Sequence, residues 1–293
     1  MTASRHSRPL STAALLLTLI VVLAGCSRLA LFNAVVPRDA GVEVRARNVV
    51  YAEGARGRLD IYGPDAGADR PLPVLLFIYG GSWNSGSKDN YAFVGRAFAA
   101  RGYVTVIADY RLVPRVRYPA FVEDSAAALA WTYRNIADYG GDPTRLFVVG
   151  HSAGAYNGAM LALEPRFLAD EGLDPAIIDG FAGLSGPYDF LPLDTDASRA
   201  AFAGVDDLEA TQPVLLDASG SPPTFVATGS EDDLVNPSNT RALAAHLRDG
   251  GGMVEERVYP GLDHAGTLLA ISRPLRGSAP VIEDIDMFFR GLN

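Results

Sequence analysis

The amino-acid sequence predicts an α/β protein with a mainly parallel sheet and helices on both faces. From about residue 48 onward, short runs of strand-forming residues alternate with segments of helical spacing. Two of these runs, 74–79 and 104–108, are almost entirely apolar, which is typical of strands buried on both faces of a parallel sheet. Such alternation also places a functional site at the carboxyl ends of the strands.

The expected elements follow the chain in order. Residues 27–45 predict a tether or short packing helix that ends at Pro37. Short strand-like runs predict strands at 59–62, 74–79, 104–108, 146–149, 180–184, 224–228 and 254–259. Helical spacing predicts helices at 91–101, 121–139, 155–163, 238–248 and 280–290, and glycines 102 and 140 provide stop signals for the first two. The stretch 185–222 is rich in loops, and we expect a small lid there.

The first 25 residues have the pattern of a secretory signal. Arg5 and Arg8 precede an apolar run of about fifteen residues, which is short for a membrane span of roughly twenty. The run ends in Leu-Ala-Gly before Cys26, which resembles the lipobox of bacterial lipoproteins, with Cys26 as the lipidated residue. The resemblance implies a protein anchored in the bacterial cell envelope, facing the periplasm or exterior. The alternative is a plain signal peptide or membrane anchor with an incidental cysteine.

Composition excludes several classes of partner. The formal net charge is −9, and an acidic body argues against nucleic acid or anionic lipid headgroups as partners. Cys26 is the only cysteine, so a disulfide within the chain is excluded. The sequence has no His-Glu-x-x-His motif, no cysteine pair and no convincing phosphate or dinucleotide loop. We therefore expect neither a metal nor a cofactor.

A Gly-x-Ser-x-Gly pattern at 150–154 suggests a nucleophile. It lies between the expected strand at 146–149 and the expected helix at 155–163. In this context small residues let the chain turn sharply and lift the serine hydroxyl above the sheet edge. Ser152 is therefore the candidate nucleophile.

A serine hydroxyl needs a base to take its proton, and the base needs a third group to hold it. Three of the four histidines are poorly placed: His6 lies in the signal segment, His151 within the turn itself and His246 in the middle of a helix. His264 follows the last strand, in a loop at its carboxyl end, and is the base by elimination.

The orienting acid is expected after the preceding strand, where Glu231, Asp232 and Asp233 follow one another. Asp232 matches the usual position in hydrolases of this kind, and the other two are the alternatives. The chain order Ser152, Asp232, His264, with each member after a strand, favours a catalytic triad over a merely solvated acidic loop.

The strand at 74–79 runs into Gly80-Gly81-Ser82-Trp83, where glycines allow backbone N–H groups to face a ligand. This segment resembles the His-Gly-Gly-Gly-Trp motif of hormone-sensitive-lipase-like carboxylesterases and their feruloyl-esterase-like bacterial relatives, which belong to the α/β-hydrolase superfamily. Tyr79 replaces the histidine of the motif, and Ser82 replaces its third glycine. The resemblance implies an oxyanion hole made by the amides of Gly81, Ser82 and Ala153.

Two other parts of the resemblance concern substrate binding and architecture. We expect Tyr79 and Trp83 to contact substrate, and packing under the loop is the alternative for Trp83. The segments 109–112 and 118–124 resemble a further stretch of the same family, and we interpret their role as structural rather than catalytic. Arg111, with arginines 115 and 117, is expected to lie in a solvated loop with one structural ion pair.

The resemblance extends over about residues 48–293. It implies an α/β-hydrolase domain at 48–293 with a lid at about 185–222, whereas the lipobox pattern predicts the signal peptide at 1–25 and leaves 26–47 as a tether and N-terminal segment. The implied activity is cleavage of small-molecule carboxylic esters through an acyl-enzyme, with acyl groups of about two to six carbons preferred because the lid has few apolar side chains. An amidase or arylformamidase with the same triad, and a catalytically silent binding protein of this fold, are the alternatives. Residues 29–36 would extend the pocket if they covered the site.

Overall fold

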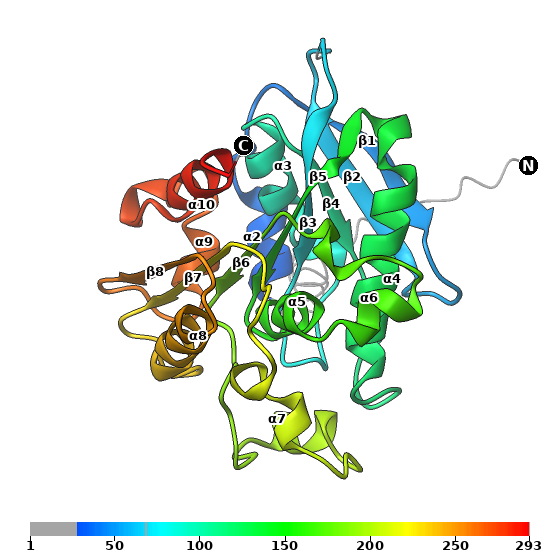
Figure 1. The fold of residues 1–293 in the computed structure, drawn as a ribbon. Helices are drawn as coiled ribbons and strands as arrows, with labels where there is room; N and C mark the ends of the chain where they lie inside the picture. Colours follow the sequence, from blue (N-terminus) through cyan, green and yellow to red (C-terminus); the bar gives the residue numbers. More distant parts are fainter. Residues whose placement is uncertain (1–27, 68, 293) are drawn as a thin grey trace, which may run out of the picture.

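The computed structural model describes residues 28–67 and 69–292. Its centre is an eight-stranded sheet with the order β1-β2-β4-β3-β5-β6-β7-β8 (Figure 1). The strands are β1 (Val42–Val50), β2 (Arg58–Pro64), β3 (Leu72–Ile78), β4 (Val104–Ala108), β5 (Gly141–His151), β6 (Gly180–Leu184), β7 (Thr224–Gly229) and β8 (Val254–Tyr259). The pairs β1–β2 and β2–β4 are antiparallel, and all other neighbouring pairs are parallel. The predicted α/β class with a mainly parallel sheet is therefore confirmed.

Helices cover both faces of the sheet (Figure 1). They are α2 (Arg28–Val35), α3 (Ala92–Ala99), α4 (Ala120–Asn135), α5 (Ala153–Leu163), α6 (Arg166–Asp170), α7 (Asp196–Ala201), α8 (Ser238–Asp249), α9 (Gly266–Leu269) and α10 (Val281–Arg290). Their apolar sides close the core in two layers, one on each face of the sheet.

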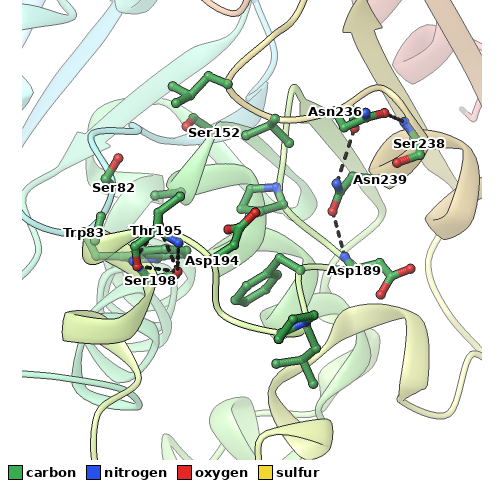
Figure 2. A pocket seen from close by; sticks show the side chains of 18 of the residues that line it. Ser82, Trp83, Ser152, Asp189, Asp194, Thr195, Ser198, Asn236, Ser238 and Asn239 are labelled. Carbon is green, nitrogen blue, oxygen red and sulfur yellow. Dashed lines mark hydrogen bonds between the residues drawn. The ribbon is translucent and has the colours of Figure 1, made fainter.

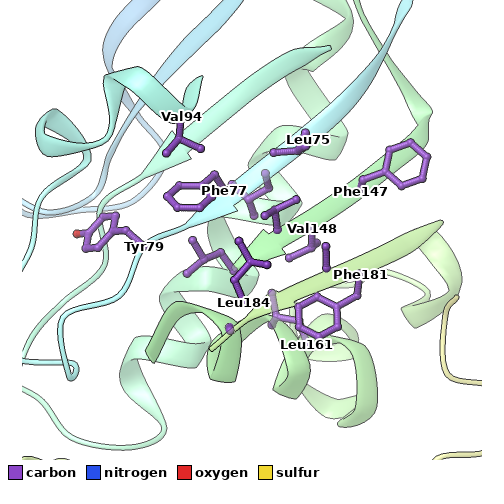
Figure 3. Close-up of a cluster of buried hydrophobic side chains, with 14 of the residues drawn as sticks. Leu75, Phe77, Tyr79, Val94, Phe147, Val148, Leu161, Phe181 and Leu184 are labelled. Carbon is purple, nitrogen blue, oxygen red and sulfur yellow. The ribbon is translucent and has the colours of Figure 1, made fainter. Parts of the chain in front are cut away.

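Alternation along the central strands decides which layer each side chain enters. Phe147 of β5 stacks on Phe289 of α10, with 4.4 Å between ring centroids. The next residue, Val148, lies on the opposite face, against Gly158 of α5. Figure 3 shows these two side chains among the buried residues around β3 and β5. Because β5 is buried from Leu146 to its end, its last residues are held firmly at the sheet edge where Ser152 follows.

The sheet starts earlier than the sequence indicated. β1 begins at Val42, inside the segment expected to be a tether, and pairs with β2 from Val42 opposite Pro64 to Val50 opposite Arg58. The charged side chains of β1 hide this strand in the sequence, because an edge strand needs only one buried face. The expected helix at 121–139 is also divided: α4 ends at Asn135, and a 3-10 turn continues to Tyr139.

The stretch expected to form a lid (185–222, called the lid below) contains α7 and two short 3-10 turns, at 209–211 and 213–215. It packs back onto the body through Phe190 and Phe202, both of which contact the Trp83 ring. Among the described residues no helix is long and apolar enough to cross a bilayer. The predicted signal peptide and Cys26 lie outside the described residues.

Candidate active site

The turn between β5 and α5 places Ser152 at the carboxyl edge of the sheet. Ser152 has φ 55° and ψ −126°, a conformation that a non-glycine residue rarely adopts and that is common at functional sites. Positions 150 and 154 on either side of Ser152 must be glycine, because other parts of the backbone come too close to leave room for a Cβ atom. A Cβ on Gly150 would lie 2.4 Å from the carbonyl oxygen of Gly154, and one on Gly154 would lie 2.1 Å from that of Ile78. The predicted sharp turn is therefore present, and small residues make it possible.

The structure brings Ser152, His264 and Asp232 into one hydrogen-bonded chain. Ser152 Oγ lies 2.9 Å from His264 Nε2, and His264 Nδ1 lies 3.0 Å and 3.1 Å from the two carboxylate oxygens of Asp232. An ionised carboxylate can only accept, so Nδ1 carries the proton and Nε2 is left as the acceptor for the serine hydroxyl. In this tautomer His264 is ready to act as a base toward Ser152.

Asp232 is held by the backbone that follows it. Its Oδ1 accepts hydrogen bonds from the amides of Val235, at 2.8 Å, and Leu234, at 3.2 Å. Burial alone would raise the pKa of Asp232, but the hydrogen bonds from His264 and the Val235 amide outweigh it and hold the pKa below its ordinary value. Asp232 is thus an anion at neutral pH. Its sequence neighbours Glu231 and Asp233 are exposed and do not contact His264.

His151 is a site residue that the sequence analysis set aside. Its Nε2 lies 2.9 Å from the carbonyl oxygen of His264, and the two imidazole rings are 5.0 Å apart. Burial lowers the pKa of His151 to about 3, so its ring is neutral and Nε2–H donates to His264. This bond fixes the backbone that carries the His264 ring. The sequence offered no sign of it, because the contact joins residues 113 positions apart.

The loop after β3 brings backbone amides close to Ser152. Gly81, Ser82 and Trp83 all have positive φ, at 122°, 50° and 57°. A Cβ on Gly80 would lie 2.7 Å from Ser152 Cβ, so only glycine permits this approach. Within the part of the chain that the structure describes, the amides of Gly81 and Ser82 have no backbone acceptor.

The third expected donor is the amide of Ala153, the first residue of α5. The first four amides of a helix lack partners within it and lie at the positive end of the helix dipole. Ser82, Ser152 and Ala153 border the same cavity. The residues that carry the three expected amides therefore border the cavities next to Ser152, where an oxyanion hole is expected.

Tyr79 does not lie where the sequence analysis expected. We expected it to contact substrate, but its ring is fully buried and borders neither cavity next to Ser152. Its hydroxyl donates to Asp109 Oδ1 at 2.7 Å and accepts from the Arg56 guanidinium at 2.6 Å. The ring also stacks between Tyr91 and Tyr110, with centroids 5.0 and 4.7 Å away. Tyr79 therefore anchors the loop from beneath.

Trp83 is packed among aromatic side chains and also borders a cavity. It is 4% exposed, stacks on Phe121 at 5.6 Å, and meets Tyr156 edge-on at 5.3 Å. Its indole Nε1–H donates to Asn157 Oδ1 at 3.1 Å. It also borders one of the two cavities. The tryptophan thus packs under the lid and contributes to a cavity wall.

The segment at 109–124 has the architectural role that we expected. The Arg111 guanidinium lies 2.7 Å from Asp124 Oδ1, and the Arg111 amide donates to Asp124 Oδ2 at 2.7 Å. This ion pair fastens the loop after β4 to the first turns of α4. In the described residues, no group of three or more His, Cys, Asp or Glu side chains is placed to hold a metal ion.

Two cavities of similar size meet at Ser152, Ser82 and Leu234. The first, of about 460 Å³, lies beneath α2 and α9 and is called the α2 chamber. The second, of about 450 Å³, lies beneath the lid and is called the lid chamber. Figure 2 labels polar side chains around the lid chamber, and Asp233 borders this chamber as well: the labelled ones are Ser82, Ser152, Asp189, Asp194, Thr195, Ser198, Asn236, Ser238 and Asn239.

A strand–helix elbow carrying serine, with histidine and aspartate on later loops of a mainly parallel sheet, places the protein in the α/β-hydrolase class. Residues 59–247 match the BD-FAE family, and the chain belongs to this family. Among solved structures, that of esterase B from Lactobacillus rhamnosis has a TM-score of 0.79 at 18% identity, covering 96% of this chain and 94% of that one.

Curated relatives are named as esterases. Carboxylesterase NlhH from Mycobacterium tuberculosis is 34% identical over 241 residues, which cover 75% of this chain and 74% of that protein. The probable isoprenylcysteine alpha-carbonyl methylesterase ICMEL1 from Oryza sativa is 32% identical over 255 residues, which cover 79% of this chain and 59% of that protein. The chain thus spans less than two thirds of the length of the latter relative.

Proposed function

We propose that the protein is a carboxylic ester hydrolase in which Ser152, His264 and Asp232 form the catalytic triad. The observation that carries this proposal is the hydrogen-bonded chain from Ser152 Oγ through His264 to Asp232, at the edge of the sheet. The names of its relatives support ester cleavage as the reaction.

The geometry supports a two-step mechanism. His264 Nε2 takes the proton of Ser152 as Oγ forms a bond with the ester carbonyl carbon, and Asp232 stabilises the imidazolium that results. The amides of Gly81, Ser82 and Ala153 hold the negative oxygen. When the intermediate collapses, the bond to the alcohol oxygen breaks and His264 returns the proton to that oxygen. Water then attacks the acyl carbon as His264 takes its proton. The bond between that carbon and Ser152 Oγ breaks, His264 returns the proton to Oγ, and the acid is released.

Substitution of the nucleophile and base tests the proposal. We expect Ser152→Ala and His264→Ala each to lower kcat by several orders of magnitude, and the double variant to lose about as much, because the two residues act as a unit. Ser219→Ala, in an exposed loop outside both cavities, is the matched control and should retain activity. Substantial hydrolysis by purified Ser152→Ala protein would contradict the mechanism.

The same assay separates the alternative reactions. An esterase should cleave acyl esters much faster than formamides or peptide amides, whereas an amidase or arylformamidase should show the reverse order. A silent binding protein of this fold should cleave none of them.

Short acyl groups, of about two to six carbons, are the preference we propose. Each buried methylene adds about 0.8 kcal/mol only where an apolar wall receives it, and the lid chamber is bordered by many polar side chains. The α2 chamber is bordered by apolar side chains of Leu29 and Phe32, from the segment that we expected to extend the pocket if it covered the site. Specificity constants for nitrophenyl esters of increasing acyl length test the preference, and a maximum at twelve carbons or longer would contradict it.

We also propose that the protein is anchored in the bacterial cell envelope by lipid attached to Cys26, because the apolar run and small residues before this cysteine suit a lipoprotein signal. Two or three acyl chains would anchor the protein stably in the bacterial envelope. Mass spectrometry of the mature N-terminus from a bacterial membrane fraction should show a lipidated Cys26. An unmodified cysteine, or cleavage elsewhere, would contradict this proposal.

A further inference from the structure

The two chambers at Ser152 differ in how they relate to the base. The α2 chamber is bordered by His264 and His151, together with Gly80 and Gly81. The lid chamber is bordered by Ala153 and Trp83, and His264 is not among its lining residues. The two sides of the nucleophile are therefore inequivalent, and a bound ester would place its acyl part on one side and its alcohol part on the other.

We propose that the α2 chamber is the leaving-group subsite and takes an apolar alcohol, while the acyl group enters the lid chamber. This inference rests on the proposed esterase function. His264 Nε2 must lie within hydrogen-bond reach of the alcohol oxygen to return its proton. The alcohol oxygen, and the carbon attached to it, must then lie on the side of the carbonyl carbon that faces His264. Of the two chambers, the one that His264 borders is the α2 chamber.

The walls of the α2 chamber indicate the chemistry of the alcohol. Apolar side chains come from α2 (Leu29 and Phe32), from α9 (Leu268 and Leu269) and from Leu234. No Asp, Glu, Lys or Arg is among the described residues that border it. A charged or polyhydroxylated alcohol would leave polar groups unpaired here, which is costly, whereas an apolar alcohol gains from burial. The volume, about 460 Å³, lies within the range of small-molecule sites.

Helix α2 is fixed in place as a wall. Asn33 makes two hydrogen bonds to the neighbouring segment: its Nδ2 donates to the Asp89 carbonyl at 2.8 Å, and its Oδ1 accepts from the Phe93 amide at 3.0 Å. Phe32 meets Phe93 edge-on, with centroids 5.4 Å apart.

The chain just after α2 is fastened as well. Asp39 pairs with the Arg276 guanidinium through both carboxylate oxygens, at 2.7 and 2.9 Å. The chamber therefore has a defined wall on its α2 side, and a substitution there should change specificity in a defined way.

Two ester series measured on the full-length chain in detergent test the assignment. The first varies the alcohol of acetate esters from methyl to hexyl, and the second varies the acyl chain of methyl esters over the same range, with acid release followed by pH-stat. Because kcat/KM includes substrate binding and every step up to loss of the alcohol, contacts to the alcohol contribute to it in the first series and contacts to the acyl chain in the second, so comparing the two series separates the subsites. In the wild type we expect kcat/KM to rise along the alcohol series, by up to about fourfold per methylene.

Phe32→Ala removes the chamber wall, and Leu31→Ala is its matched control because Leu31 is the adjacent residue, 46% exposed and outside the chamber. We expect Phe32→Ala to lower kcat/KM for hexyl acetate at least tenfold, with methyl acetate and the acyl-series trend little changed. Leu31→Ala should change neither series. If Phe32→Ala destabilises the fold, as judged by thermal unfolding, Leu29→Ala supplies the same comparison at the first turn of α2.

Three results would overturn the assignment: a flat alcohol series in the wild type, an effect of Phe32→Ala confined to the acyl series, or an equal effect of Leu31→Ala. The second would show that the acyl group occupies the α2 chamber. Failure of the esterase proposal looks different, because the wild type would then cleave no ester in either series, or Ser152→Ala would cleave them equally well.

Discussion

Asn substitution at Asp232 is the sharpest test of how the site works. The Oδ1 atom of Asp232 accepts hydrogen bonds from the Val235 and Leu234 amides, so in Asp232→Asn the amide oxygen should keep this place. The NH₂ group would then occupy the position of Oδ2 and point at His264 Nδ1. The NH₂ group repels the Nδ1 proton there, and the amide oxygen at the Oδ1 position, 3.1 Å from Nδ1, is a weaker acceptor than a carboxylate, so the tautomer with the proton on Nε2, facing Ser152 Oγ, becomes favoured. His264 could then no longer accept the serine proton.

Loss of the orienting carboxylate in such a triad typically lowers kcat by about four orders of magnitude, about 5 kcal/mol. We therefore expect Asp232→Asn to retain roughly 0.01 to 0.1% of wild-type kcat on nitrophenyl acetate at saturating substrate. Asp233→Asn is the comparison variant, because Asp233 is exposed and makes no hydrogen bond with His264; it borders the lid chamber, so its effect should fall mainly on KM, and its kcat should fall far less than that of Asp232→Asn. Glu231→Gln, exposed and outside both chambers, is the matched control and should stay within about twofold. A greater loss in Asp233→Asn, or less than a tenfold loss in Asp232→Asn, would refute this account of the base.

Three further substitutions test other parts of the site. Gly80→Ala should lower kcat/KM at least about 100-fold, because its Cβ would lie 2.7 Å from Ser152 Cβ, whereas Gly277→Ala meets nothing within 4 Å and should be neutral in the same assay. Tyr79→Phe removes the hydroxyl bonded to Asp109 and should lower kcat roughly tenfold with little change in KM, and an unchanged kcat would contradict its anchoring role. The pKa of His151 is near 6.5 in the unfolded chain and about 3 in the folded protein. Between pH 3 and pH 6.5 only the unfolded state binds a proton at this ring, so the free energy of unfolding falls as the pH drops below 6.5. Denaturant titrations at pH 7 and pH 5 should therefore show wild type losing about 2 kcal/mol more than His151→Gln, and equal losses would refute the neutral buried ring.

Sequence reasoning predicted the fold, and it selected candidate residues that the structure brings together, because both depend on local patterns. A buried run such as 146–149 identifies β5, and the short spacing of Gly150, Ser152 and Gly154 identifies the turn that follows. His264 was selected as the candidate base by elimination among four histidines, and it lies within hydrogen-bond distance of Ser152.

The features that the sequence did not predict depend on contacts between distant segments. The bond from His151 to the His264 carbonyl, and the packing of Phe32 on Phe93, join parts of the chain that no local pattern relates. β1 was missed for another reason, since its charged side chains fit a solvated tether as well as an edge strand. The sequence shows which segments are apolar enough to be buried, but not which other buried segments they pack against.

The substitution at position 79 shows why the loop tolerates a departure from the family motif. The donors expected in the oxyanion hole are backbone amides, so residue 79 needs only to hold the loop in place. β3 and β4 run parallel, with Phe77 opposite Ile107, so the residues two positions further along, Tyr79 and Asp109, leave the sheet side by side. Any side chain that reaches Asp109 with a hydrogen-bond donor meets this requirement, and the tyrosine hydroxyl does so at 2.7 Å. A histidine ring carries an N–H donor as well, so Tyr79→His should preserve kcat far better than Tyr79→Phe, and equal losses in the two variants would show that the stacked ring rather than the hydrogen bond positions the loop.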